Sequence, residues 1–195
     1  MMTTLTLQAT PQKSIPGDLA MWFFILAELL VFGVLFICYG ITRFADPALF
    51  NAGQTHLHAG QAAWNTLFLI TGSGTAVLAA HAIARLQYRQ GSIFLVATFA
   101  SGVLFVVNKL MEFASYLGQG YTLSTDNFWM FYLFLTFFHF LHVILGMVII
   151  AAVWIKLQQG HYRNGQTAGV ETATSYWHMV DLVWIVLFPL VYLIR

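Results

Sequence analysis

Charged side chains are scarce in this sequence. Asp, Glu, Lys and Arg make up 8% of the residues, while hydrophobic residues make up 59% and the mean hydropathy is +0.77. A soluble domain usually carries about 25% charged residues. The composition therefore excludes a soluble globular domain and indicates an integral membrane protein.

The sequence also lacks any cluster of basic residues. Its eight Lys and Arg residues are scattered singly, and the formal net charge is +1. Nucleic acid is held mainly by groups of Lys and Arg that neutralise phosphates. The charge pattern therefore excludes nucleic acid as a partner.

Cysteine is almost absent, and the usual catalytic motifs are missing. Cys38 is the single cysteine and lies in an apolar run, so it cannot form an intramolecular disulfide, and we expect it to be a small core residue. There is no CxxC motif, phosphate loop or pairing of a nucleophile with a base. No broken helix or inverted repeat suggests a transporter. Nothing therefore predicts catalytic residues in a chain acting alone.

Five long apolar runs are present, and each meets the roughly 20 residues that a helix needs to cross a bilayer. They predict an all-α, polytopic membrane protein, with one domain over residues 18–195 that forms a five-helix transmembrane bundle. Residues 1–17 are expected to be a polar cytoplasmic tail, and residues 44–60, 85–91 and 157–170 to be loops. The expected spans are residues 18–43, 61–84, 92–116, 127–156 and 171–195.

The basic residues divide unequally between the two ends of such a bundle. One end would carry Lys13, Arg85, Arg89, Lys156 and Arg163, and the other Arg43, Lys109 and Arg195. Lys and Arg are enriched on the cytoplasmic side of membrane proteins. We therefore expect the N terminus in the cytoplasm and the C terminus on the periplasmic side.

Ionisable residues inside the apolar runs are the candidate functional residues. At ~1.5 Å of rise per residue, five of them share a depth near the middle of the membrane. His178 and Asp181 are three residues apart, which would let the carboxylate accept a hydrogen bond from the imidazole. Because lipid cannot solvate such groups, we expect one internal cluster among the first, fourth and fifth spans. Its members would be Glu28, His139, His142, His178 and Asp181.

Three interpretations of this cluster remain open. It is a structural knot that fixes the register of the helices, a relay or antenna for protons, or a metal site built from HxxH and the carboxylates. Two of the candidate metal ligands would be needed to neutralise each other, which weighs against the metal site.

Other polar and small residues have expected structural roles. Lys109 and Glu112 would pair and extend toward the membrane surface, and Glu171 would complement the dipole of the last helix. His81 would bond a neighbouring helix, and His56, His58 and His161 would lie in solvated loops. A helix-packing stripe would serve either a contact within the bundle or a contact with another subunit. It consists of Gly72, Ala76, Ala80 and Ala84.

Several motifs resemble, in order, subunit III of the haem-copper oxidases. They are FFILAELLVFGVLF around Glu28, AAWNTLFLITGSGTAVLAAH, KLMEF, HFLHVILG and, near the end, YWHMVDLVW after a Glu. They span nearly everything from Pro16 to Arg195. The long form of the family has seven helices, and its first two are absent here. The resemblance is to the short bacterial quinol-oxidase form and to the homologue encoded with nitric oxide reductases. Further polar positions match at Asn65, His81, Glu112 and Glu171.

The resemblance implies an accessory subunit in a bacterial inner membrane. Such a subunit carries no cofactor or metal, docks on the catalytic subunit of a terminal oxidase or nitric oxide reductase, stabilises it and aids proton uptake. Haem and copper or iron would belong to that partner. Membrane lipids would be the other partner, although the lipid cleft of the long form depends on the two absent helices. The alternative is a free-standing membrane protein that uses its Glu and His residues for proton transfer or small-molecule binding.

Overall fold

The computed structural model describes residues 19–164 and 167–194. The expected cytoplasmic tail, together with Lys13 and Arg195, lies outside the described residues, so the structure does not bear on these predictions.

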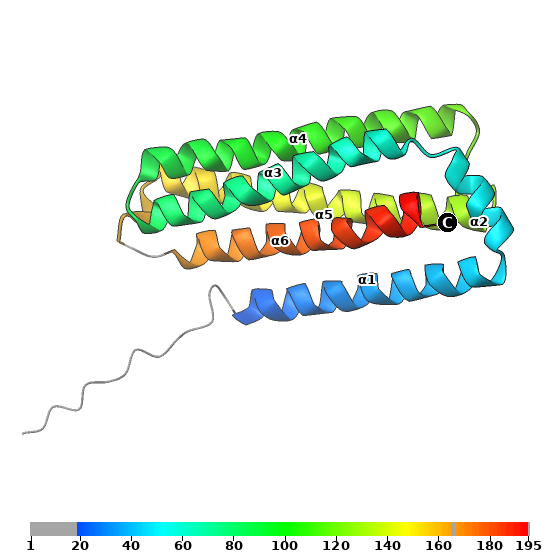
Figure 1. The fold of residues 1–195 in the computed structure, drawn as a ribbon. Coiled ribbons are helices and arrows are strands. Elements are labelled where there is room, and N and C mark those ends of the chain that lie inside the picture. The colour runs from blue at the N-terminus through cyan, green and yellow to red at the C-terminus, as the bar shows by residue number, and fades with distance from the viewer. Residues whose placement is uncertain (1–18, 165–166, 195) are drawn as a thin grey trace, which may run out of the picture.

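Five helices in the described part of the chain are long and apolar enough to cross a membrane. No strand occurs there, which confirms the predicted all-α bundle (Figure 1). The helices are α1 (Leu19–Ala45), α3 (Ala59–Ala84), α4 (Tyr88–Gly118), α5 (Asn127–Gln158) and α6 (Ala168–Phe188). Two shorter elements, α2 (Pro47–Thr55) and a 3₁₀ helix (His161–Asn164), lie between them, and a π-helical turn (Pro189–Leu193) extends α6.

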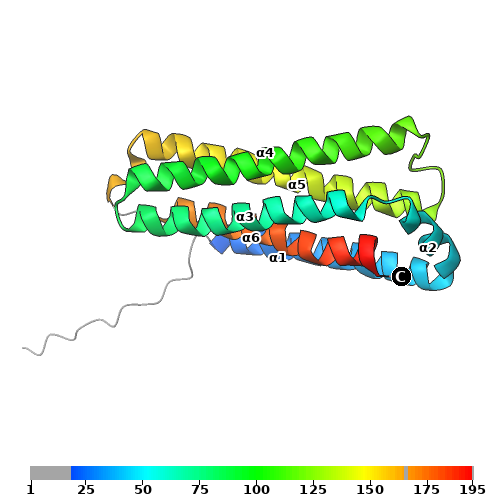
Figure 2. The ribbon, with the colours of Figure 1, turned by 45° about the horizontal axis from the view of Figure 1, so that its top comes forward.

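Four of the long helices form the body of the bundle, and α1 lies at its edge. α3 and α4 are an antiparallel hairpin, and α6 packs against α1, α3 and α5. Figures 1 and 2 show α1 alongside α6, on the side away from α4. In the most apolar stretch of α1, 11% of the residues are buried, compared with 56% in α6 with its π-helical turn. α6 is therefore the central helix and α1 the peripheral one.

The segment expected to be one loop, residues 44–60, contains a helix instead. Asp46 caps α2 by accepting a hydrogen bond from the Leu49 backbone N–H at 3.1 Å, and Pro47 occupies the first turn, where its missing N–H costs nothing. Phe50 is fully buried, with its ring against Tyr39 and Phe128. A cap, a proline and one apolar anchor are enough for a helix of this length.

The last span also differs from a simple helix. Its α-helical part begins at Ala168, three residues before the expected start, and stops at Phe188. Pro189 has no N–H to continue the α-helical ladder, and the chain passes into a π-helical turn. This turn ends the fifth span, and it sets the direction of Tyr192.

The packing stripe divides along its length. Gly72 and Ala76 are buried, Ala80 is half-buried and Ala84 is exposed. A Cβ atom at Gly72 would overlap the side chain of Ser101 on α4 and lie 3.3 Å from the Trp177 ring on α6. The first half of the stripe is therefore a contact within the bundle. Cys38, expected in the core, is exposed because it lies on the outer side of α1.

We expect Gly72→Ala to lower the free energy of unfolding by about 1–3 kcal/mol, because the added methyl group forces neighbouring side chains to move. Gly74→Ala is the matched control, since a Cβ atom there meets nothing within 4 Å on the same helix. It should be neutral, or stabilising by about 0.5–1 kcal/mol. Unfolding of both variants in detergent, followed by circular dichroism, measures the difference. Equal effects would contradict the close contact at Gly72.

Candidate functional site

A carboxyl and an imidazole meet between α1 and α5, close to the middle of both helices. Glu28 Oε2 lies 3.0 Å from His142 Nε2, and the two side chains are 20% and 9% exposed. His142 Nδ1 lies 2.8 Å from the Phe138 carbonyl oxygen, which can only accept, so Nδ1 carries a hydrogen. Nε2 faces the Glu28 carboxyl, so the two side chains form a hydrogen-bonded pair.

Aromatic rings fix the imidazole of this pair. The rings of Phe32 and Phe138 stand edge-on to His142 at centroid distances of 5.2 and 4.7 Å. Tyr176 donates to the backbone oxygen of His142 at 3.3 Å. The position of the imidazole is thus set by α1, α5 and α6 together.

His139 points toward a different helix from His142. It is fully buried, and its Nε2 donates to the Val180 carbonyl of α6 at 3.1 Å. Nδ1 has no hydrogen-bond partner among the described residues, so a neutral ring suits this site. The rings of Phe105 and Trp184 enclose it. His139 is a polar tie between α5 and α6.

The hydrogen bond expected between His178 and Asp181 is not formed, so that prediction was wrong. His178 Nδ1 lies 2.6 Å from Ser73 Oγ on α3. Both carboxyl oxygens of Asp181 are buried without a hydrogen-bond partner among the described residues, and the neutral acid is the form that costs less to bury. The helix face that His178 and Asp181 share packs against α3, so the His178 imidazole forms its hydrogen bond with the Ser73 hydroxyl.

The single expected cluster is therefore three separate sites. Glu28 with His142 lies between α1 and α5, His139 between α5 and α6, and His178 with Asp181 between α6 and α3. The expectation failed because an equal depth in the membrane does not give an equal direction around each helix. In the described part of the chain, no group of three His, Cys, Asp or Glu residues is arranged to hold a metal ion.

Lys109 and Glu112 form a fourth polar site, in which the expected pairing is present but the expected position is not. Lys109 Nζ lies 2.9 Å from Glu112 Oε2, but both residues are completely buried rather than extended to the membrane surface as expected. The hydroxyls of Tyr132 and Tyr192 donate to Glu112 Oε1 at 2.6 and 2.8 Å, and Lys109 donates to the Tyr192 oxygen at 2.8 Å. We call these four residues the buried lysine network.

Aromatic faces complete the surroundings of this ammonium group. Its nitrogen lies 5.0 Å from the centre of the Phe113 ring and 5.2 Å from that of Tyr132, within the range of cation–π attraction. The spacing of Lys109 and Glu112 signals their pairing in the sequence. No signal there assigns Tyr132 and Tyr192 to them, because the two tyrosines arrive from α5 and from the π-helical turn.

The remaining candidates have mostly local partners. Asn65 is buried and accepts from Asn108 Nδ2 at 2.7 Å. His81 is exposed, and its Nδ1 bonds the Val77 oxygen of its own helix, so the expected contact with a neighbouring helix was wrong. Glu171 lies in the first turn of α6 and accepts from Thr167 Oγ1 at 2.6 Å.

Two of these residues meet the exposed half of the packing stripe. His81 and Glu171 line an open hollow of about 290 Å³ between α3 and α6, together with Ala80 and Ala84. Elsewhere, the backbone N–H of His58 donates to the Tyr116 hydroxyl at 3.1 Å, and the His56 ring lies against Tyr121.

Comparison with known proteins decides the family. The model for cytochrome c oxidase subunit III matches residues 10–194. The chain belongs to this family. The Synechocystis cytochrome c oxidase subunit 3 is 38% identical over 177 residues, which cover 88% of this chain and 72% of the relative. The Thermostichus vulcanus protein of the same name is 34% identical over 172 residues, covering 88% and 84%.

A third relative is much longer than the chain. The haem-copper oxidase subunit I+III of Aeropyrum pernix is 31% identical over 181 residues, which are 90% of this chain and 22% of that protein. The predicted membership of the subunit III family is thus confirmed, and with its five apolar helices the chain is a multi-pass membrane protein.

Substitutions in the buried lysine network should change the free energy of unfolding. Lys109→Met or Glu112→Gln alone should lower the free energy of unfolding by about 3–5 kcal/mol, because each leaves the other residue buried without its partner. The double variant should lose less than the sum of the two. Lys156→Met, which removes an exposed lysine, should stay within about 0.5 kcal/mol. Chemical denaturation in detergent provides the four values, and additive losses would show that the pair is not coupled.

Proposed function

We propose that the chain is an accessory subunit of a haem-copper oxidase and carries no cofactor of its own. It docks through its helices on the catalytic subunit, which holds the haem and copper, and it stabilises that subunit during turnover. The observation that carries this proposal is the match of the subunit III family model to residues 10–194. The name of the Aeropyrum pernix relative joins a subunit I to a subunit III in one protein, which supports a close partnership.

The reaction of the partner is proposed from the relatives. Those in Synechocystis and Thermostichus vulcanus are named as subunits of cytochrome c oxidase. This favours an oxygen-reducing partner over a nitric oxide reductase, whose metal would include iron in place of copper. The absence of a metal-ligand group among the described His, Cys, Asp and Glu residues is compatible with the accessory role.

Purification from the native membrane in a mild detergent tests the proposal. A tag on the chain should recover a larger polypeptide together with the absorption bands of haem, and elemental analysis should assign copper to that fraction. A chain that purifies from native membranes alone, free of any haem protein, would overturn the proposal. That result would favour a free-standing membrane protein that uses its own Glu and His residues.

A role in proton uptake is a second proposal, and one observation favours it. Glu28 lies 3.0 Å from His142 and is 20% exposed at the seam between α1 and α5. A partner subunit packed on this seam would reach the Glu28 carboxyl. The buried lysine network lacks such exposure, since both charged side chains are fully buried.

Substitutions at Glu28 separate the structural role from the proton role. Glu28→Gln should change stability little, because its amide can still donate to His142 Nε2. Glu28→Ala leaves that nitrogen unpaired and should cost about 1–3 kcal/mol. We expect the complex with Glu28→Gln to assemble and turn over normally, as a structural pair requires. Normal assembly with slowed turnover would instead assign the pair to proton uptake. Thermal unfolding and oxygen consumption by the complex distinguish these cases.

The proposed location is a bacterial inner membrane, with the N terminus in the cytoplasm. The unequal division of Lys and Arg between the two ends supports this orientation. A reporter enzyme fused after Arg195 should then be active on the periplasmic side. Activity in the cytoplasm would contradict the orientation.

A further inference from the structure

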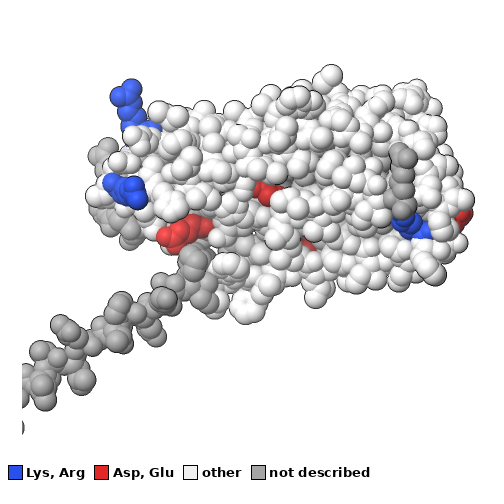
Figure 3. Space-filling model, viewed as in Figure 1, with Lys and Arg blue, Asp and Glu red and all other residues white. Residues whose placement is uncertain are grey.

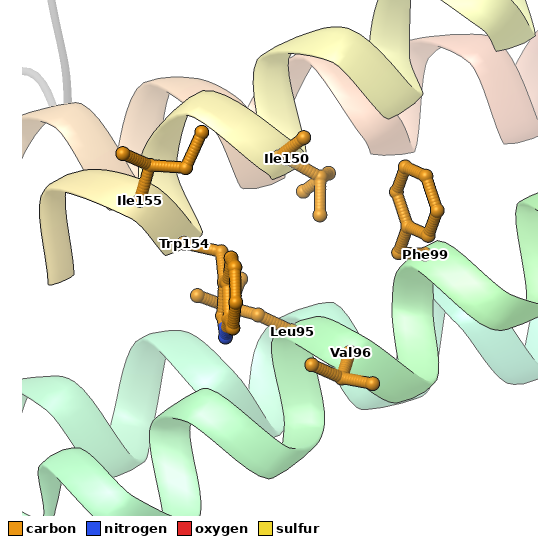
Figure 4. Close-up of a pocket in the computed structure, with 7 residues that line it drawn as sticks. Leu95, Val96, Phe99, Ile150, Trp154 and Ile155 are labelled. Carbon is orange, nitrogen blue, oxygen red and sulfur yellow. The ribbon is translucent and has the colours of Figure 1, made fainter. Parts of the chain in front are cut away.

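An apolar groove runs between α4 and α5 on the outer surface of the bundle. Two adjoining hollows of about 250 and about 480 Å³ form it, and they share Phe99, Ala151 and Ile155. Leu95 and Ile150 are each 1% exposed and form its floor. In Figure 4, the ring of Trp154 reaches from α5 toward α4, the ring of Phe99 rises from α4, and a space remains between them.

The groove has the length of one lipid chain. On α5 its lining extends from Ile155 to Ile144, about 16 Å at ~1.5 Å of rise per residue. One leaflet of a bilayer has a hydrocarbon thickness of about 15 Å, half of the full core. Both hollows are lined by apolar side chains alone, so the occupant must be apolar over this length.

One end of the groove is polar. Trp154 Nε1 and Gln158 Nε2 both donate to Ser92 Oγ, at 2.9 and 2.8 Å, and so join α5 to α4 there. Arg89 and Ser92 stand on the same stripe of α4 as Val96 and Phe99, with helical spacings of three and four residues. The lining of the groove therefore leads directly to an exposed arginine.

The two helices that form the groove carry positive charge at this end, and the acid of this end, Glu171, stands on α6 and lines the hollow between α3 and α6. Lys156 is exposed and follows Val148 and Ala152, which line the second hollow, at steps of four residues on α5. α5 contains no Asp or Glu, and α4 contains only Glu112, which lies toward its far end and is buried. Figure 3 shows Lys and Arg side chains at the end of the bundle where α4 begins, with Asp or Glu atoms also at that end, and no Lys or Arg along the middle of the visible face.

We propose that this groove binds one anionic phospholipid. An acyl chain lies between α4 and α5 with the rings of Trp154 and Phe99 against it, and Arg89 and Lys156 hold the phosphate at the polar end. Ser92 accepts two hydrogen bonds and retains its own hydroxyl hydrogen to donate to the headgroup. This site uses only helices of the described bundle, unlike a cleft that needs two further helices, and it does not depend on the proposed oxidase partnership.

Native mass spectrometry of the purified full chain tests the proposal, with phosphatidylglycerol and phosphatidylcholine of identical chains as probes. We expect one retained phosphatidylglycerol per chain and at least fivefold weaker retention of phosphatidylcholine. Arg89→Gln and Lys156→Gln should each weaken phosphatidylglycerol binding about fivefold. Arg85→Gln, which removes an exposed charge at the end of α3, is the matched control and should bind as the unaltered chain does.

A second pair of variants tests the groove itself. Ala151→Trp fills the space shared by both hollows and should abolish retention of either lipid, whereas Val34→Trp, on the exposed side of α1, should not. Equal retention of both lipids, unchanged in the Arg89 and Lys156 variants, would mean a nonspecific lipid shell and would overturn the proposal. A photo-crosslinker on Ala152→Cys, in a Cys38→Ser background, should label lipid in native membranes. Labelling of a polypeptide instead would make the groove a protein interface and would also overturn it.

Discussion

Every polar side chain within the five spans needs a partner inside the protein, because hydrocarbon offers none. α6 supplies several of these partners. Its Val180 carbonyl accepts from His139 of α5, its His178 bonds Ser73 of α3, and the π-helical turn after it brings Tyr192 to Lys109 of α4. The most buried helix is thus hydrogen-bonded to α3 and α5, and the turn that extends it is hydrogen-bonded to α4.

The polar sites differ in what they can exchange with their surroundings. The buried lysine network is closed by two tyrosines and by aromatic faces, so it is suited to holding a fixed charge pair. The pair of Glu28 and His142 instead lies under the loosely packed α1, with Glu28 partly exposed. Chemistry with a partner subunit is therefore more readily assigned to the edge of the bundle than to its centre.

Sequence reasoning was sufficient for the spans but not for the directions of their side chains. Apolar runs of the required length placed the helices to within a few residues. Direction around the helix depends on packing, and His139 and His142, three residues apart, therefore serve different neighbours. The contact of Tyr192 with Lys109 could not be predicted from the sequence, because the π-helical turn after Pro189 changes which residues share a helix face.

The short helix α2 has a consequence for the order in which the chain is assembled in the membrane. Gln54, near its end, donates to the carbonyl of Val191 at 2.8 Å, across 137 positions of sequence. Tyr192, one residue further, completes the buried lysine network. Gln54 and Lys109 therefore gain their last hydrogen-bond partners only when nearly the whole polypeptide has been synthesised. Until residues 189–193 are present, Lys109 and Glu112 have each other and Tyr132, but not the Tyr192 hydroxyl that completes the network.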